Sequence, residues 1–220
     1  MGLEEFTDIE ARLWRAVDQL EAEFQGIYTR DHIESVVKAS ARQLRGAAVA
    51  SFVPTLAHRF ARERLRAQAQ MEGKLAKTVT EVVFVSITGG GRARMAASLL
   101  ERHSDQELSV HTAGSGDASG IDSNVLVAME EIGIDLTDKY TRPLTAEVLA
   151  SADVVVTMGR SVGAVEVPDA ARHVDWRVGD PAGASLEEVR RVREDIERRV
   201  ELLAAELTHR AVVGSTADAD

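Results

Sequence analysis

Cysteine is absent from this chain of 220 residues. Thiolates form disulfides, bind zinc and act as enzyme nucleophiles, so its absence excludes all three kinds of chemistry. Histidine is scarce, with six residues, and no two of them stand at ligand spacing on one predicted helical face. Solvated or partly buried histidines are the favoured interpretation. The sequence therefore predicts no metal site and no cofactor.

Basic residues are too few to balance the acidic ones. Lys and Arg number 26 against 36 Asp and Glu, which gives a formal net charge of −10. Because nucleic-acid binding needs a basic surface, we expect no nucleic-acid partner. The longest apolar runs, such as 82–85 and 154–156, are too short to span a bilayer. The N-terminus opens on Glu4, Glu5 and Asp8 rather than on a basic signal-peptide segment, so we expect a cytoplasmic protein with no membrane partner.

Apolar side chains recur every three or four residues in three stretches of the first 76 residues, which indicates amphipathic helices. The first helix is expected to end at Gly26, the second to begin at about Thr29, and the third to end near Gly73. Short connections between them predict an N-terminal three-helix bundle over residues 1–76. A unit of this size has a small core, so we expect it to pack on the rest of the chain or to form a homodimer through these helices.

The pattern changes after Thr80, where short β-branched runs alternate with helical periods. Strands that alternate with helices predict a doubly wound α/β domain with a four-stranded parallel sheet over residues 79–207. The remaining residues, 208–220, are polar and alanine-rich, and we expect a flexible tail. The buried strands are predicted at 82–85, 108–112, 153–157 and 173–176.

A glycine-rich loop follows the first predicted strand and leads directly into a helix. It reads Ser86-Ile87-Thr88-Gly89-Gly90-Gly91-Arg92. Glycines let successive N–H groups point inward, and the helix start adds partial positive charge, so the loop suits an anion. An arginine at the edge of the loop can donate hydrogen bonds to two oxygens of a tetrahedral anion. On the loop alone, a structural turn with a surface arginine is an equally good interpretation. The residues predicted to bind the anion are Thr88, Gly89, Gly90, Gly91 and Arg92.

Around this loop the chain resembles the low-molecular-weight tyrosine phosphatases and thiol-dependent arsenate reductases. That family carries Cys-x-x-Asn-x-x-Arg-Ser between its first strand and first helix. The matching positions here are Ser86, Gly89, Arg92 and Ala93. The stretch 60–65 resembles a helical extension found in an actinobacterial subgroup, so the resemblance covers nearly the whole chain. Further blocks that resemble the arsenate reductase branch are 112–115, 132–136, 157–159 and 180–183.

The resemblance implies roles for three residues. In the family the cysteine attacks phosphorus or arsenic as a thiolate, the arginine binds the oxyanion, and an aspartate before proline protonates the leaving group. Those positions are Ser86, Arg92 and Asp180 here. A serine hydroxyl is a weak nucleophile without a base to take its proton, and no histidine lies nearby in the sequence. Catalysis by the family route is therefore not expected.

Other departures from the family pattern point the same way. Gly89 replaces the asparagine that braces the loop, Ala93 replaces the hydroxyl that supports the nucleophile, and residues 158–164 lack the second thiol of the reductases. Arg160 in that segment is interpreted as a solvated arginine rather than a second anion contact. The resemblance thus implies a catalytically impaired homologue that binds phosphate, arsenate or a phosphorylated ligand. Two alternatives stay open: an active reductase or phosphatase that uses an external thiol or Ser86, and a regulatory or structural partner with a vestigial pocket.

Overall fold

The computed structural model describes residues 3–44, 52–86, 91–104, 108–114, 121–136, 142–159 and 165–217. Thr88, Gly89 and Gly90 of the predicted anion loop lie outside the described residues, as does Arg160. The chain divides into two compact units, which are described separately. A helical unit comprises residues 1–77 and 145–151, and an α/β unit comprises residues 78–144 and 152–220.

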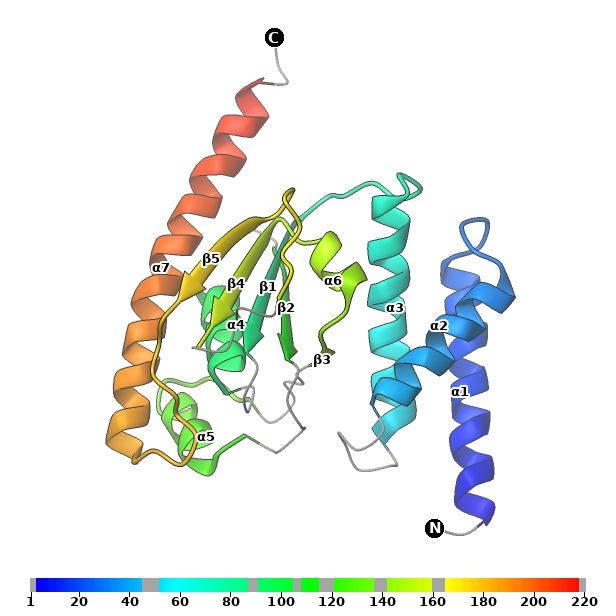
Figure 1. Cartoon of the computed structure of the whole chain (residues 1–220), viewed down its shortest axis with the longest axis horizontal. Helices are drawn as coiled ribbons and strands as arrows, with labels where there is room; N and C mark the ends of the chain where they lie inside the picture. Colours follow the sequence, from blue (N-terminus) through cyan, green and yellow to red (C-terminus); the bar gives the residue numbers. More distant parts are fainter. Residues whose placement is uncertain are drawn as a thin grey trace. The chain divides into compact units, whose positions relative to one another are not determined.

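Among the described residues, the helical unit has four helices, one of which comes from much later in the chain than the others. Each of the first three helices contributes one apolar face to a shared buried core, which confirms the predicted N-terminal helical region. The helices are α1 (Leu3–Glu23), α2 (Arg30–Gln43), α3 (Val53–Met71) and α6 (Ala146–Ala150) (Figure 1). Fully or nearly buried core side chains are Val17, Leu20, Phe24, Ile33, Val36, Val37, Ala61 and Leu65.

A buried arginine joins α3 to α6. The Arg64 guanidinium donates from Nη2 to Oε1 of Glu147 at 2.8 Å and from Nη1 to Oγ of Ser40 at 3.3 Å. Burial, the largest single effect, raises the pKa of Glu147, but the hydrogen bonds from Arg64, from the backbone and from Thr145, together with the charge of Arg64, outweigh it and lower that pKa. By sequence position α6 falls between strands of the predicted α/β domain, yet its packing assigns it to the helical unit.

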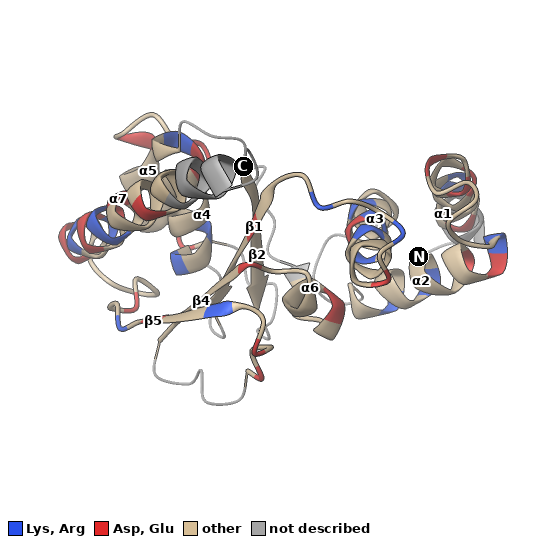
Figure 2. Cartoon of the chain, turned by 90° about the horizontal axis from the view of Figure 1, so that it is seen from above, with Lys and Arg blue, Asp and Glu red and all other residues tan. Residues whose placement is uncertain are grey.

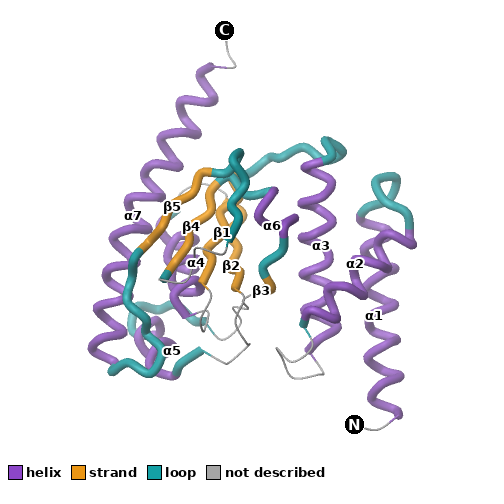
Figure 3. Tube along the Cα trace, in the orientation of Figure 1, coloured by secondary structure: helices purple, strands orange, loops and turns teal. Residues whose placement is uncertain are grey.

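The α/β unit is built on a parallel sheet (Figure 3). The chain winds outward from β1 to β2 and β3, then returns to pair β4 with the other side of β1. The predicted doubly wound parallel sheet is confirmed. It gains one strand, β3, which the sequence does not predict because two residues show no alternation. In spatial order the strands are β3 (Arg142–Pro143), β2 (Leu108–Gly114), β1 (Thr80–Ser86), β4 (Val154–Met158) and β5 (Arg172–Trp176).

One face of the sheet packs on three helices, α4 (Gly91–His103), α5 (Ser123–Glu130) and α7 (Leu186–Ala217). Alternate strand residues reach this core, among them Phe84 of β1, whose ring lies 5.7 Å from that of Trp176. The helices contribute Leu99 and Leu100 from α4, Ala128 and Met129 from α5, and Ile196, Val200 and Leu203 from α7. This core fixes α4 and α7 against the same sheet face.

The last helix is longer than the sequence predicts. It continues past Leu207, the expected end of the domain, to Ala217, so the tail expected to be flexible is helical over most of its length. No glycine or proline interrupts residues 208–213, which explains why the helix does not stop there. Within the described residues, none of the helices combines the length and the apolar composition needed to cross a membrane.

Candidate anion site

The predicted site lies where the strand order of the sheet reverses. β1 and β4 pair side by side, and Ser86 at the end of β1 is in register with Met158 at the end of β4. In a doubly wound sheet, ligands bind beyond the carboxyl ends of the strands at this point. Ser86 is buried there, and the chain re-enters the described structure at Gly91, the first residue of α4. The residues on both sides of the predicted loop therefore flank the usual ligand position of such sheets.

Arg92 is held in the first turn of α4 and is paired with Asp180. Its Nη2 lies 3.2 Å from Oδ2 of Asp180, and the arginine side chain is 6% exposed against 47% for the aspartate. Asp180 Oδ1 also accepts a hydrogen bond from the N–H of Ala182 at 3.2 Å, which orients the carboxylate within its turn. Two predicted site residues that are distant in the sequence thus meet at the start of one helix.

Gly159 packs closely against the guanidinium of this arginine. It follows β4 directly and has φ +92°, a conformation that L side chains rarely adopt. A Cβ atom at this position would lie 3.1 Å from both terminal nitrogens of Arg92, so a larger residue would require the guanidinium to shift by a few tenths of an ångström. Sequence reasoning cited Gly159 only within a block of family resemblance. A glycine immediately after a buried strand is the sequence signal that could have identified this position.

The turn that carries Asp180 is tied to the start of α5. Asp122 accepts from the N–H of Asn124 at 2.9 Å, as the N-cap of α5, and its other oxygen accepts from the N–H of Gly183 at 3.1 Å. The Asn124 side chain donates to the carbonyl of Ala184 at 2.9 Å. Sequence reasoning missed Asp122 and Asn124. An aspartate just before an apolar helical period is an N-cap signal that could have identified the first.

The histidines of the sheet cannot activate Ser86. His111 on β2 is in register with Val83 of β1, and so is His173 through β4. Side chains alternate along a strand, so Ser86 shares the face of Phe84, while Val83 and both histidines point to the other face. The register also separates them from Ser86 by three residues, about 10 Å along the strand.

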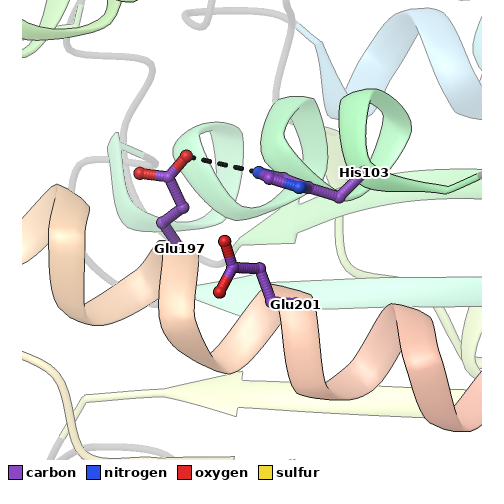
Figure 4. Close-up of side chains that lie close together, drawn as sticks. All are labelled: His103, Glu197 and Glu201. Carbon is purple, nitrogen blue, oxygen red and sulfur yellow. Dashed lines mark hydrogen bonds and ion pairs between the residues drawn. The ribbon is translucent and has the colours of Figure 1, made fainter.

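A second group of chemically active side chains lies away from this site. His103, the last residue of α4, faces Glu197 and Glu201 of α7 (Figure 4). Their potential metal-ligating atoms lie within 4.8 Å of one another. The prediction of no metal ligands considered histidines on one helical face, and these three residues come from two helices. Spacing in the sequence could not have revealed the group.

Comparison with known proteins agrees with the resemblance around the loop. Residues 81–213 match the family described as low molecular weight phosphotyrosine protein phosphatase, and residues 13–69 match the protein-tyrosine-phosphatase-like N-terminal domain. The solved thioredoxin-dependent arsenate reductase of Corynebacterium glutamicum is 29% identical, with a TM-score of 0.78 over 89% of this chain and 96% of that one.

Other relatives match a smaller part of this chain. An arsenate reductase of Bacillus cereus is 32% identical over 123 residues, which are 54% of this chain and 91% of that protein. A solved arsenate reductase in the phosphate binding state is 28% identical, with a TM-score of 0.51 over 59% of this chain and 99% of its own. The Corynebacterium glutamicum protein thus matches most of this chain, whereas the other two match little more than half of it.

Proposed function

The chain belongs to the low molecular weight phosphotyrosine protein phosphatase family, and we propose that it is a catalytically impaired member that binds phosphate or arsenate-like oxyanions at Arg92. The observation that carries the proposal is a buried guanidinium at the first turn of α4, beside a strand that ends in Ser86 instead of cysteine. The arginine needed to hold an oxyanion is present, and the nucleophile needed to transform it is not.

The surroundings of Arg92 support anion binding. The N-terminus of α4 carries partial positive charge from its unpaired N–H groups, which attracts anions to the position of Gly91 and Arg92. The Gly159 backbone packs against the guanidinium and limits its freedom, so less rotamer entropy is lost when a ligand binds. Phosphate and arsenate are both tetrahedral oxyanions, and one relative was solved as an arsenate reductase in the phosphate binding state. Both ions are therefore suitable probes.

Three features support the loss of catalysis. The chain has no cysteine, so neither a thiolate nucleophile nor a pair of thiols to supply electrons to arsenate is available from the protein itself. Ser86 would need a base, and the sheet histidines point to the opposite face. Ala93, at the position of the family's supporting hydroxyl, is fully buried and cannot donate a hydrogen bond from its side chain.

The ion pair with Asp180 opposes an incoming anion. The carboxylate already compensates the arginine, and a second negative charge must compete with it or displace it. Both partners of the new contact also lose water, since phosphate is strongly hydrated. We therefore expect a dissociation constant in the range of roughly 0.1–10 mM.

Calorimetric titration of the full chain with phosphate and with arsenate tests the binding. Arg92→Ala should abolish the heat of binding, whereas the control Arg177→Ala should retain it. Arg177 is an arginine that lies three residues before Asp180 and is 92% exposed. Binding that survives in Arg92→Ala would mean that the anion sits elsewhere. No binding to the native chain would favour the regulatory or structural alternative with a vestigial pocket.

Activity assays test the impairment separately. Aryl phosphate hydrolysis and thiol-dependent arsenate turnover should both stay at the level of buffer, because no activated nucleophile is present. Turnover that disappears in Ser86→Ala, or arsenate reduction that an external thiol supports and Arg92→Ala abolishes, would establish the active alternative and overturn the proposed impairment.

A further inference from the structure

Three side chains with metal-binding atoms meet between the end of α4 and the middle of α7. His103 reaches from α4 toward the two glutamates, and Glu197 and Glu201 point from α7 toward the histidine (Figure 4). The two glutamates are four residues apart, so they stand on one face of the helix. Both helices pack on the same apolar core through Leu99, Leu100 and residues of α7, which holds the two backbones in place.

The charges on α7 make this group unusual. Basic and acidic side chains are interspersed along the helix (Figure 2), and most of its arginines pair with other acids. Arg198 and Arg199 lie next to Glu197 and Glu201 in the sequence, but both pair with Asp195, at 3.0 and 3.3 Å.

The two glutamates are left to repel each other. Within the described residues, the ion pair of Glu197 is with His103, and neither Glu197 nor Glu201 pairs with a lysine or arginine. Like charges at this spacing destabilise a helix slightly. A cation between them would remove that repulsion.

The geometry suits a tetrahedral cation. Zinc binds histidine nitrogen and carboxylate oxygen at about 2.0–2.2 Å, so two of its ligand atoms are about 3.3 Å apart. Nε2 of His103 and Oε1 of Glu197 are already 3.2 Å apart. Glu201 is exposed and completes the group within 4.8 Å, a gap that a change of side-chain rotamer closes.

We propose that His103, Glu197 and Glu201 bind a divalent transition-metal cation, with Zn²⁺ as the representative ion, and that the bound ion clamps α4 to α7. An imidazole ligand favours zinc-like ions over Mg²⁺ and Ca²⁺, which prefer oxygen ligands alone. Eleven residues separate His103 from Arg92, or about 16 Å along the helix. The metal site is therefore distinct from the anion site, and it does not depend on the proposed function.

Binding should be seen both as affinity and as stability. A ligand that binds only the folded chain raises its unfolding temperature. Removing one ligand should weaken zinc binding by about tenfold or more, since even outer-shell changes around metal sites have effects of that size. Without metal, Glu201→Gln should leave the unfolding temperature unchanged or raise it, because it removes a repulsion. A merely structural role for Glu201 would give a lower temperature instead.

The experiment uses the full chain without a histidine tag, stripped with a chelator and titrated with ZnCl₂ in calorimetry and in thermal unfolding. Glu197→Gln and Glu201→Gln should each lose the zinc-induced rise in unfolding temperature and weaken binding by about tenfold or more. The control Glu187→Gln changes an exposed glutamate about 15 Å away along α7 and should behave as the native chain. Unchanged zinc affinity in both glutamine variants, or no zinc binding by the native chain, would overturn the proposal.

Discussion

Asp180 pairs with Arg92 at 3.2 Å, so in the proposed anion site its carboxylate competes with the anion for the guanidinium. Asp180→Asn keeps the size of the side chain and removes the negative charge. Phosphate should then bind more tightly, by up to about fivefold, since a half-exposed ion pair is worth at most about 1 kcal/mol. Calorimetry would measure the change, with Asp175→Asn as a control at another exposed carboxylate near the strand ends. Weaker binding in Asp180→Asn would show that Asp180 helps to hold the anion.

The close packing of Gly159 against the Arg92 guanidinium can be tested by substitution. Gly159→Ala places a methyl group 3.1 Å from both terminal nitrogens of Arg92 and also strains a backbone with φ +92°. Gly133→Ala is the matched control, because Gly133 has φ +77° and open space around it. Each change should destabilise the chain by about 1–2 kcal/mol through backbone strain. Phosphate affinity should fall in Gly159→Ala alone, and an equal affinity in both variants would exclude a role for the packing of Gly159 against Arg92.

Restoring the cysteine nucleophile tests whether the other substitutions at the loop also impair catalysis. Ser86→Cys alone should return little aryl phosphatase activity, because Ala93 is fully buried and offers no hydroxyl to the thiolate. Adding Ala93→Ser and Gly89→Asn should raise the rate well beyond the single change and in a non-additive way. Hydrolysis rates and thiol reactivity across the series would measure this. If Ser86→Cys already matches the triple variant, the loop retains its catalytic geometry.

At the scale of elements, one N-cap also anchors the turn that carries Asp180. Asp122 caps α5 and accepts from the N–H of Gly183, so Asp122→Ala removes two acceptors at once. We expect a loss of about 2 kcal/mol in the free energy of unfolding, against about 1 kcal/mol for Ser185→Ala. Ser185 is the matched control because it caps α7 in a capping box with Glu188. Urea unfolding measures both, and equal losses would mean that the contact with Gly183 contributes nothing.

The attachment of α6 to α3 should depend on pH. The pKa of Glu147 lies below its usual 4.5, because burial, which raises it, is outweighed by the hydrogen bonds that the carboxylate accepts and the charge of Arg64 acting together. A depressed carboxyl pKa stabilises the folded chain above about pH 4.5, and this contribution is lost as the pH falls through the lowered value. Glu147→Gln should therefore be less stable than the native chain at pH 7, with a difference that shrinks toward pH 3. A constant difference across that range would assign the effect to packing.

At the scale of the whole molecule, self-association through the N-terminal helices is a proposal that rests on their small core. Trp14 of α1 is an exposed large apolar side chain, with the Lys38 ammonium 5.3 Å from its ring centre. We expect a dimer in light scattering of the full chain and a monomer for Trp14→Arg. The control Leu202→Arg changes an exposed apolar residue on α7 and should remain dimeric. A monomeric native chain would exclude the homodimer.

Removing residues 1–77 would be a poorer test of the same point. The chain passes between the two units at residues 77–78, 144–145 and 151–152. Truncation would therefore take α3 away from α6 and leave Glu147 without Arg64. Any change in oligomeric state would be mixed with the loss of that contact, whereas a surface substitution leaves the helical unit complete.

The sequence by itself determined the classes of structure and the missing chemistry. Periods of two and of three to four residues are local properties, so the longer strands of the sheet and the helices α1, α2 and α3 could be predicted from neighbouring residues. The glycine-rich segment before Arg92 and the absence of cysteine likewise needed no structure to be read. The two-residue β3 and the true end of α7 escaped prediction, since one is too short for a period and the other lies beyond Gly214, a residue type that usually ends a helix.

Only the tertiary structure decided which distant residues meet. Arg92 pairs with Asp180, Glu147 pairs with Arg64, which is distant in the sequence, and His103 faces two glutamates of α7. Each contact joins segments whose separation depends on the path of the chain through the whole sheet, and spacing along the sequence carries no information about that path. The registers of β2 with β1, β1 with β4 and β4 with β5 decided in the same way that Ser86 and the sheet histidines point to opposite faces.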